Sequence, residues 1–221
     1  MTNTLLTRGA LITAVSTLAI TLSACGSDDA SGSSASSNTS SSASESADSS
    51  MAASSDEPFG AGCSAVPTEG AGSFTGMAAD PVATAASNNP ALSTLVQAVT
   101  AANLVDTLNT TNNITVLAPA NPAFEAIPPD TLNAVLADTA QLTAILTHHV
   151  IPGRLTPEQL AGTHTTLNND EVTIEGSGSA FTVPAAATLT QQKPATVVCG
   201  NVQTANATVY IVDQVLAPAA G

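Results

Sequence analysis

Basic residues are nearly absent from this chain of 221 residues. Three Lys and Arg stand against 17 Asp and Glu, and the formal net charge is −14. A protein that follows a phosphate backbone needs clustered Lys and Arg, so we expect no nucleic-acid partner. The same shortage argues against attachment to an anionic membrane through a polybasic patch.

Aromatic residues are also scarce, with four Phe, one Tyr and no Trp. Carbohydrate and single-stranded nucleic acid are often held by stacking on aromatic faces, so this composition argues against both ligands. The core must instead be built from Leu, Val, Ile and Ala.

The chain lacks the common catalytic motifs. It has no Gly-x-Ser-x-Gly elbow, phosphate loop, His-Glu-x-x-His or Cys-x-x-Cys sequence. The acidic run Asn169-Asp170-Glu171 lacks the spacing of a calcium loop. We expect that the protein is not an enzyme and that it binds no metal ion and no cofactor. The alternative is a hydrolase whose catalytic residues are far apart in the sequence and meet only in the fold, although the chain has only three His for such a site.

Only one long apolar run is present, from Ala10 to Leu22. Its length of about 13 residues suits a signal peptide and falls short of the roughly 20 residues of a membrane-spanning helix. The run ends in Leu22-Ser23-Ala24-Cys25, which resembles the lipobox of bacterial lipoproteins. The resemblance implies that residues 1–24 are removed, and that Cys25 carries lipid and anchors the chain outside the cytoplasmic membrane, with partial release as a further option. An ordinary secretory signal or a transmembrane anchor is the alternative.

The segment that follows, residues 25–57, is rich in Ser and has no hydrophobic period. Such a segment cannot bury enough apolar surface to offset the entropy lost on ordering. We therefore predict a disordered linker that acts as a stalk, and a folded region over residues 58–221.

Helix signals come first in the folded region and strand signals come later. Asp80-Pro81 and Asn89-Pro90 resemble an N-cap followed by Pro at the first helical position. Apolar residues then recur with helical spacing, for example over residues 92–99 and 142–149. The expected strands are 114–118, 172–175, 196–199, 202–204 and 208–212. The last strand does not alternate, so we expect it to be covered on both faces. This order predicts an α+β domain.

Three stretches together resemble the signature segments of the fasciclin-like domain. They are 113–124 (NITVLAPANPAF), 146–153 (LTHHVIPG) and 208–218 (TVYIVDQVLAP). Their order and spacing agree with the family, and the resemblance covers about residues 75–218. It implies a single fasciclin-like domain in which N-terminal helices pack on a mostly antiparallel β-wedge. One departure is Ala120, where Thr is more usual in the family.

The residues of these motifs suggest structural or adhesive roles, not catalysis. Pro119 ends a strand, Asn121 is expected to cap the next helix, and Phe124 is expected to enter the core. Asp213 is expected to accept backbone N–H bonds. The full set is Ala118, Pro119, Asn121, Phe124, His148, His149, Val150, Asp213, Val215 and Leu216.

The His pair is the best candidate for chemistry. Adjacent helical residues point about 100° apart and chelate one metal ion poorly. His149 shares a helical face with Leu142, Ile145 and Leu146, so we expect it to be buried and His148 to be the more exposed. The pattern favours a structural histidine; a metal-binding or pH-sensing role is the alternative.

Two cysteines remain if Cys25 is lipidated. The short domain behind a lipobox and a Ser-rich segment resembles the secreted and lipoprotein mycobacterial antigens of the fasciclin family, and this resemblance implies a disulfide between Cys63 and Cys199. An exported chain sits where disulfides persist, and the long loop would be worth up to about 5 kcal/mol. Two free or buried thiols are the alternative.

The family resemblance implies a lipid-anchored, non-enzymatic adhesion or interaction module with a protein or matrix partner at the cell surface. That function predicts a continuous exposed apolar or polar patch and no deep cavity. The alternative is an extracytoplasmic binding protein for a lipid or small apolar ligand, which predicts an elongated apolar pocket of about 300 Å³ or more.

Overall fold

The computed structural model describes residues 57–218. The predicted signal peptide, Cys25 and the linker as far as residue 56 lie outside these residues. Within residues 57–218, no helix combines the length and the apolar character needed to cross a membrane.

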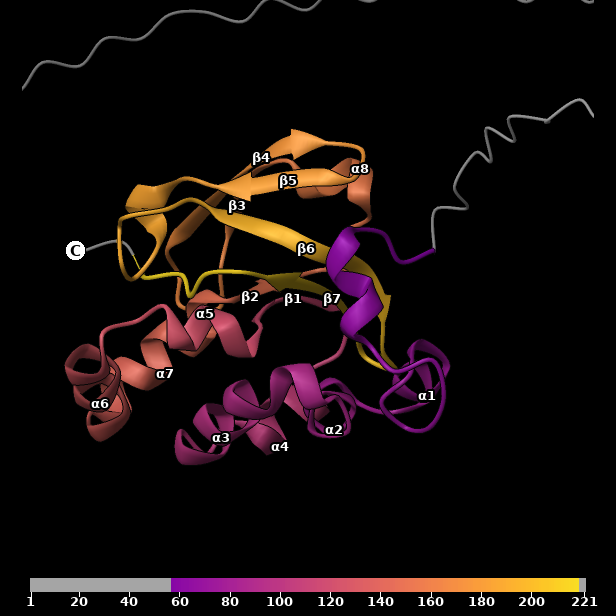
Figure 1. Ribbon diagram of the computed structural model, residues 1–221, viewed down its shortest axis with the longest axis horizontal. Helices are drawn as coiled ribbons and strands as arrows, with labels where there is room; N and C mark the ends of the chain where they lie inside the picture. The colour runs from indigo at the N-terminus through magenta and orange to yellow at the C-terminus, as the bar shows by residue number, and fades with distance from the viewer. Residues whose placement is uncertain (1–56, 219–221) are drawn as a thin grey trace, which may run out of the picture. The chain divides into compact units, whose positions relative to one another are not determined.

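Short helices fill the first half of the described chain (Figure 1). They are the 3₁₀-helices η1 (Ala61–Ala65), η2 (Pro90–Leu92) and η3 (Ala185–Ala187), and the α-helices α1 (Phe74–Ala79), α2 (Val82–Ser87), α3 (Ser93–Ala101), α4 (Val105–Thr110), α5 (Asn121–Glu125), α6 (Pro129–Ala137), α7 (Thr139–His148) and α8 (Pro157–Leu160). Asp138 divides α6 from α7, because its carboxylate accepts hydrogen bonds from the first free N–H groups of α7, those of Ala140 and Gln141.

The start of α2 corrects a prediction. Pro81, not Asp80, holds the N-cap position, and no side chain of the local sequence caps the helix. The Val82 N–H instead donates to Oδ1 of Asn206, 2.8 Å away and 124 positions later in the chain. Asp80 accepts a bond from Asn88 Nδ2 at 3.2 Å. A distant amide has therefore replaced the local cap that the sequence suggested.

The strands form one seven-stranded sheet in the order β2-β1-β7-β6-β5-β4-β3. Their bounds are β1 (Ile114–Pro119), β2 (Val150–Pro152), β3 (Gly162–Thr165), β4 (Glu171–Ser177), β5 (Ala180–Val183), β6 (Ala195–Gln203) and β7 (Ala207–Val212). The pair β1–β7 is parallel and every other pair is antiparallel. The sheet nearly closes, because the Leu167 N–H beyond β3 donates to the Val150 carbonyl of β2 at 2.8 Å. The predicted fold class, helices on a mostly antiparallel β-wedge, is confirmed.

Strand β6 differs from the prediction in one respect. The two short strands expected at 196–199 and 202–204 form one strand with register shifts between Val197, Cys199 and Val202. A bulge bends a strand without ending it, and for this reason the Gly200-Asn201 interruption looked like a break in the sequence.

The middle strands separate two hydrophobic clusters. Every residue of β1 and β7 is buried, and successive side chains point to opposite faces. Val116 and Ala118 pack in the cluster under the helices, whereas Leu117 packs in the cluster enclosed by β3–β5 and α8. Figure 1 shows helices α2–α7 on one side of β1 and β7, and strands β3–β5 on the other. The expectation that 208–212 is covered on both faces is therefore confirmed.

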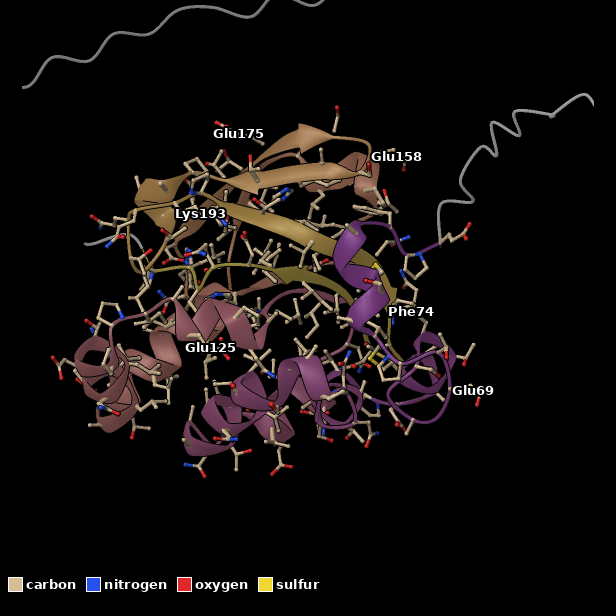
Figure 2. The ribbon with its side chains drawn as sticks, in the orientation of Figure 1. Glu69, Phe74, Glu125, Glu158, Glu175 and Lys193 are labelled. Atoms are coloured by element: carbon tan, nitrogen blue, oxygen red, sulfur yellow. A yellow bond between two sulfur atoms is a disulfide. The ribbon has the colours of Figure 1, made fainter. Side chains whose placement is uncertain are left out.

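A disulfide joins Cys63 of η1 to Cys199 of β6, across 136 positions of sequence. It is drawn in yellow in Figure 2. This is the pair for which the family resemblance implies a bond. Beside it, Phe59 and Gly200 exchange backbone hydrogen bonds of 3.1 and 2.8 Å. A Cβ at Gly200 would lie 2.4 Å from the Phe59 ring, so this close approach requires glycine.

Candidate functional site

His149 is a buried residue that holds two parts of the fold together. It follows the last residue of α7 and is only 2% exposed. Its Nδ1 lies 2.7 Å from the Ile145 carbonyl, and its Nε2 accepts from the Leu216 N–H at 3.0 Å. The Leu216 donor requires an unprotonated Nε2, so the proton of the neutral ring is on Nδ1 and is donated to Ile145.

The electrostatics of His149 agree with this geometry. Burial, partly opposed by the hydrogen bond to Ile145 and reinforced by His148, lowers the pKa of His149 from 6.5 to about 4. The ring is therefore neutral at pH 7, and both nitrogens are engaged. His149 serves the packing of the domain, as its place on the face of Leu142, Ile145 and Leu146 suggested.

His148 is buried as well, and the prediction that it is the more exposed of the pair is wrong. It is 1% exposed, because the loop between β3 and β4 covers it. Its Nδ1 lies 2.8 Å from Oδ1 of Asp170 in that loop. Its Nε2 has no hydrogen-bond partner among residues 57–218.

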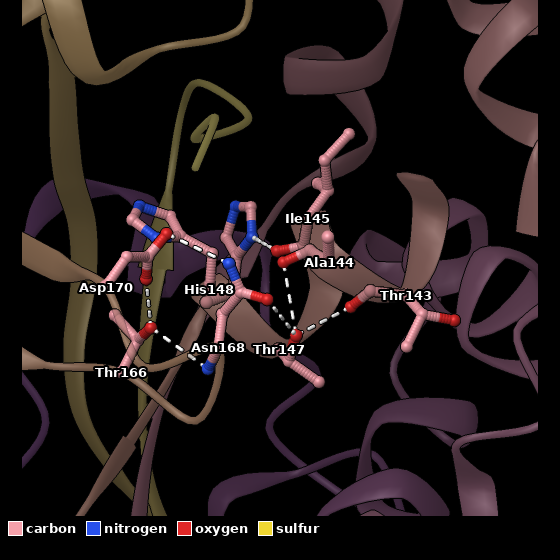
Figure 3. Close-up of polar contacts among 9 residues, drawn as sticks. Thr143, Ala144, Ile145, Thr147, His148, Thr166, Asn168 and Asp170 are labelled. Carbon is pink, nitrogen blue, oxygen red and sulfur yellow. Dashed lines mark hydrogen bonds and ion pairs between the residues drawn. The ribbon is translucent and has the colours of Figure 1, made fainter. Parts of the chain in front are cut away.

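The Asp170 carboxylate accepts hydrogen bonds from several side chains, as Figure 3 shows. The Thr166 hydroxyl and the His148 ring contact Oδ1, and Asn168 Nδ2 donates to Oδ2 at 3.0 Å. Burial raises the pKa of Asp170, but the bonds from Thr166, His148 and Asn168 outweigh it and hold the pKa below its ordinary value. The carboxylate stays ionised at neutral pH and orients His148 against the loop.

The residues of the first motif, 113–124, pack in the core and cap a helix, but the capped helix is not the one that was expected. Ala118 and Phe124 are buried in the helical cluster, and Pro119 is the last residue of β1. Asn121 does not cap α5, whose N-cap residue is Ala120 and has no capping side chain. Its Oδ1 accepts from the Thr94 N–H at 3.0 Å, and its Nδ2 donates to the Pro90 carbonyl at 2.9 Å. Asn121 therefore caps α3, the helix packed beside it.

The closing motif also has a structural arrangement. Asp213 accepts the expected backbone bond, from the Thr196 N–H at 2.6 Å, and a second bond from Lys193 Nζ at 2.8 Å. Val215 and Leu216 are buried in the two different clusters. Val150, next to the His pair, is buried and begins β2.

An apolar cavity lies between the helices and the sheet, a feature that the alternative function, binding of a small apolar ligand, predicted and that the adhesion function did not. Its volume is about 250 Å³, and its walls come mainly from α2, α3, α4, β1 and β7, with His149 at one side. The only sequence signal was the helical face of Leu92, Leu95, Val96 and Val99, all of which line it. Elsewhere among residues 57–218, no group of three or more His, Cys, Asp or Glu is placed to hold a metal ion.

Comparison with known proteins relates the chain to a family of surface proteins. A family model described as the fasciclin domain matches residues 90–218. The chain is 44% identical over 178 residues to the cell surface glycolipoprotein MPB83 of Mycobacterium bovis, covering 77% of this chain and 76% of that protein. It is also 44% identical over 177 residues to the immunogenic protein MPT70 of Mycobacterium tuberculosis, covering 76% of this chain and 86% of that protein.

A solved structure of a FAS1 domain pair from the insect cell adhesion molecule fasciclin I is also similar. The identity is 28% and the TM-score is 0.45, over 58% of this chain and 45% of the insect chain. The family match covers more than half of the chain, and it includes all three motifs that the sequence singled out. The chain belongs to the fasciclin-domain family.

Proposed function

We propose that this protein is displayed outside the cytoplasmic membrane by a lipid on Cys25, and that its fasciclin domain acts as a non-enzymatic interaction module for a protein or matrix partner. The observation that carries the proposal is the 44% identity to a protein named as a cell surface glycolipoprotein, over 77% of this chain. The lipobox and the Ser-rich segment of the sequence agree with the same display.

The geometry of the motif residues supports a binding role over catalysis. Both nitrogens of His149 are bonded, the Asp213 carboxylate is occupied by Thr196 and Lys193, and Asn121 caps a helix. A general base needs a free lone pair within reach of a substrate. Among the described residues His148 Nε2 has no hydrogen-bond partner, but the ring is 1% exposed and out of reach of a substrate.

The acidic surface also suits a displayed domain. Figure 2 shows the labelled Glu69, Glu125, Glu158 and Glu175 at separate positions around the domain. Residues 57–218 hold 12 of the 17 Asp and Glu against two Lys and Arg, a formal net charge of −10, and charge spread in this way favours solubility and repels anionic surfaces. The partner of such a domain is therefore expected to be neutral or basic.

The lipid anchor is tested first, with the full-length chain expressed in a bacterium that processes lipoproteins. Wild type is expected in the detergent phase of Triton X-114. Cys25→Ala removes the acyl acceptor and is expected in the aqueous phase or unprocessed. Ser27→Ala, two positions later, is the matched control and should partition as wild type does. Detergent partitioning of Cys25→Ala would rule out the anchor.

The interaction is tested on whole cells. Cells that display the full-length chain are compared with cells that lack it, for adhesion to plates coated with individual matrix proteins. Display is expected to raise adhesion to at least one coating, and soluble protein added in excess should compete. Equal adhesion of displaying and non-displaying cells to every coating would refute the interaction role, even if the lipid anchor is real.

A further inference from the structure

The cavity described above opens to the surface between three short helices. Its lining includes exposed hydroxyl side chains at Thr84, Ser87, Thr100 and Thr107, which belong to α2, α3 and α4. Deeper in, buried side chains of the sheet form the floor, among them Val209 and other residues of β1, β6 and β7. A small molecule can therefore enter between the helices and contact an apolar interior.

The lining carries no ionised group. No Asp, Glu, Lys or Arg belongs to it, and its one titratable side chain, His149, has both ring nitrogens engaged. Residues 57–218 contain one Arg and one Lys, and neither lines the cavity. Arg154 donates hydrogen bonds to Gln203 and to two backbone carbonyls, and Lys193 forms an ion pair with Asp213. Burying an unpaired charge is expensive, so the cavity suits an uncharged ligand.

One buried polar group offers the ligand a hydrogen bond. Asn89 is 1% exposed and lines the cavity. Its Oδ1 accepts from the Ala91 N–H at 3.0 Å, which fixes the orientation of the amide. Among the described residues, the acceptor for its Nδ2 is the Met77 sulfur at 3.7 Å, and a thioether is a weak acceptor. An amide donor is therefore available to an oxygen atom of a ligand.

Water is a poor occupant of this space. A buried water molecule needs two to four polar partners, and the polar atoms of the lining are largely committed within the protein. Thr204 Oγ1 bonds to the backbone of Ala207, and Thr147 Oγ1 bonds to the Thr143 carbonyl. An apolar interior with so few free polar partners favours an apolar molecule over ordered water.

The volume sets the size of the ligand. A cavity of about 150 Å³ admits benzene, whereas sites for drug-sized molecules begin near about 300 Å³. At about 250 Å³, this cavity lies between the two. We propose that it binds a small, uncharged, mainly hydrocarbon molecule of on the order of ten non-hydrogen atoms, with one oxygen that accepts a hydrogen bond from Asn89 Nδ2. The cavity departs from the expectation that an adhesion module has no deep cavity, so this site adds a binding role to the surface interaction proposed above.

The ligand class is tested with 1-octanol, octanoate and octylammonium, which share one alkyl chain and differ in charge. Calorimetric titration of the folded protein at pH 7 is expected to show saturable binding of one 1-octanol. The two charged analogues are expected to bind at least about tenfold more weakly, because a charge would have to be desolvated without a partner. No saturable octanol binding, or equal binding of octanoate, overturns the proposal.

The location is tested by filling the cavity from two different helices. Val96→Phe in α3 and Val105→Phe in α4 enlarge half-buried lining residues, and each is expected to reduce octanol affinity at least about tenfold. Ala101→Phe is the matched control, because Ala101 belongs to α3 but is exposed and is not in the lining. Circular dichroism establishes that each variant is folded. Unchanged affinity in the folded cavity variants, or an equal loss in Ala101→Phe, overturns the site.

The polar contact has its own test. Asn89→Asp keeps the acceptor for the Ala91 N–H and removes the amide donor, so octanol affinity is expected to fall several-fold. The affinities of the wild type for 1-octanol and 1-chlorooctane test the same contact without a variant. The chlorine atom of 1-chlorooctane is a poor hydrogen-bond acceptor, so its affinity is expected to be the lower of the two. Equal affinity for the two ligands in wild type overturns the assignment of the ligand oxygen to Asn89.

Discussion

His149 is expected to make the stability of this domain depend on pH in a defined window. Its pKa is 6.5 in an unfolded chain and about 4 in the folded protein. Between these values the unfolded state binds a proton that the folded state refuses, so the free energy of unfolding falls as pH falls. The contribution is complete above pH 6.5, is lost progressively down to pH 4, and changes no further below that.

The magnitude follows from the same values. At about 1.4 kcal/mol for each pKa unit, the fall from 6.5 to about 4 corresponds to about 3 kcal/mol in total. Most of it, about 2.5 kcal/mol, is expected to be lost between pH 7.5 and pH 4.5. Asp170 acts in a different window: its pKa is held below the ordinary value, so its contribution is lost only as pH falls through that lower pKa.

The assay is urea unfolding followed by far-UV circular dichroism at several pH values. His149→Leu keeps an apolar side chain but leaves the Leu216 N–H and the Ile145 carbonyl unpaired. It is expected to destabilise the protein by about 2–5 kcal/mol at pH 7 and to flatten the dependence between pH 6.5 and 4. His164→Gln is the control, because His164 also contacts a carbonyl four residues earlier, that of Leu160, but is only half-buried. A slope that persists in His149→Leu and vanishes in His164→Gln would refute the reasoning.

Three further outcomes are expected. Cys199→Ser should lower the free energy of unfolding by about 2–5 kcal/mol, and reductant should destabilise wild type but not this variant; a reductant-insensitive wild type would contradict the disulfide to Cys63. Asn121→Ala should cost about 1–2 kcal/mol in urea unfolding because α3 loses its cap, while Asn112→Ala, which is exposed, should stay within about 0.5 kcal/mol; equal effects would reject the cap. EDTA should leave the thermal unfolding midpoint unchanged, because His148 Nδ1 is already paired with Asp170, and a chelator-dependent shift lost in His148→Ala would reveal a metal site.

Much of the local structure was readable because its causes are local. Asn89 caps the Ala91 N–H from two residues away, and Pro119 closes β1, as the sequence indicated. The absence of alternation in β7 correctly predicted a strand covered on both faces. The hydrophobic periodicity alone predicted only an α+β domain, and the family motifs were needed to predict the fasciclin-like fold.

The errors arose where a partner comes from far along the chain. His148 was expected to be exposed because its neighbour occupies the apolar helical face, but the Thr166–Asp170 loop folds over it. Asn206 caps α2 from 124 positions away, so the sequence credited the nearby Asp80 instead. Spacing along one element carries no information about such contacts. The residues that line the cavity could not be identified for the same reason, since the cavity exists only where three short helices meet the sheet.

The position of His149 decides which variants can separate stability from ligand binding. Its ring lines the cavity, yet it also ties α7 to the backbone of Leu216 near the end of the domain. A change at His149 therefore alters the fold and the cavity wall together, and lost binding in such a variant would not locate the ligand. Val96 and Val105 line the same cavity from half-buried positions. If the cavity is a binding site, Val96→Phe and Val105→Phe should reduce octanol affinity at least about tenfold. The pH dependence that belongs to His149 should stay intact, because neither valine takes part in the hydrogen bonds of the ring.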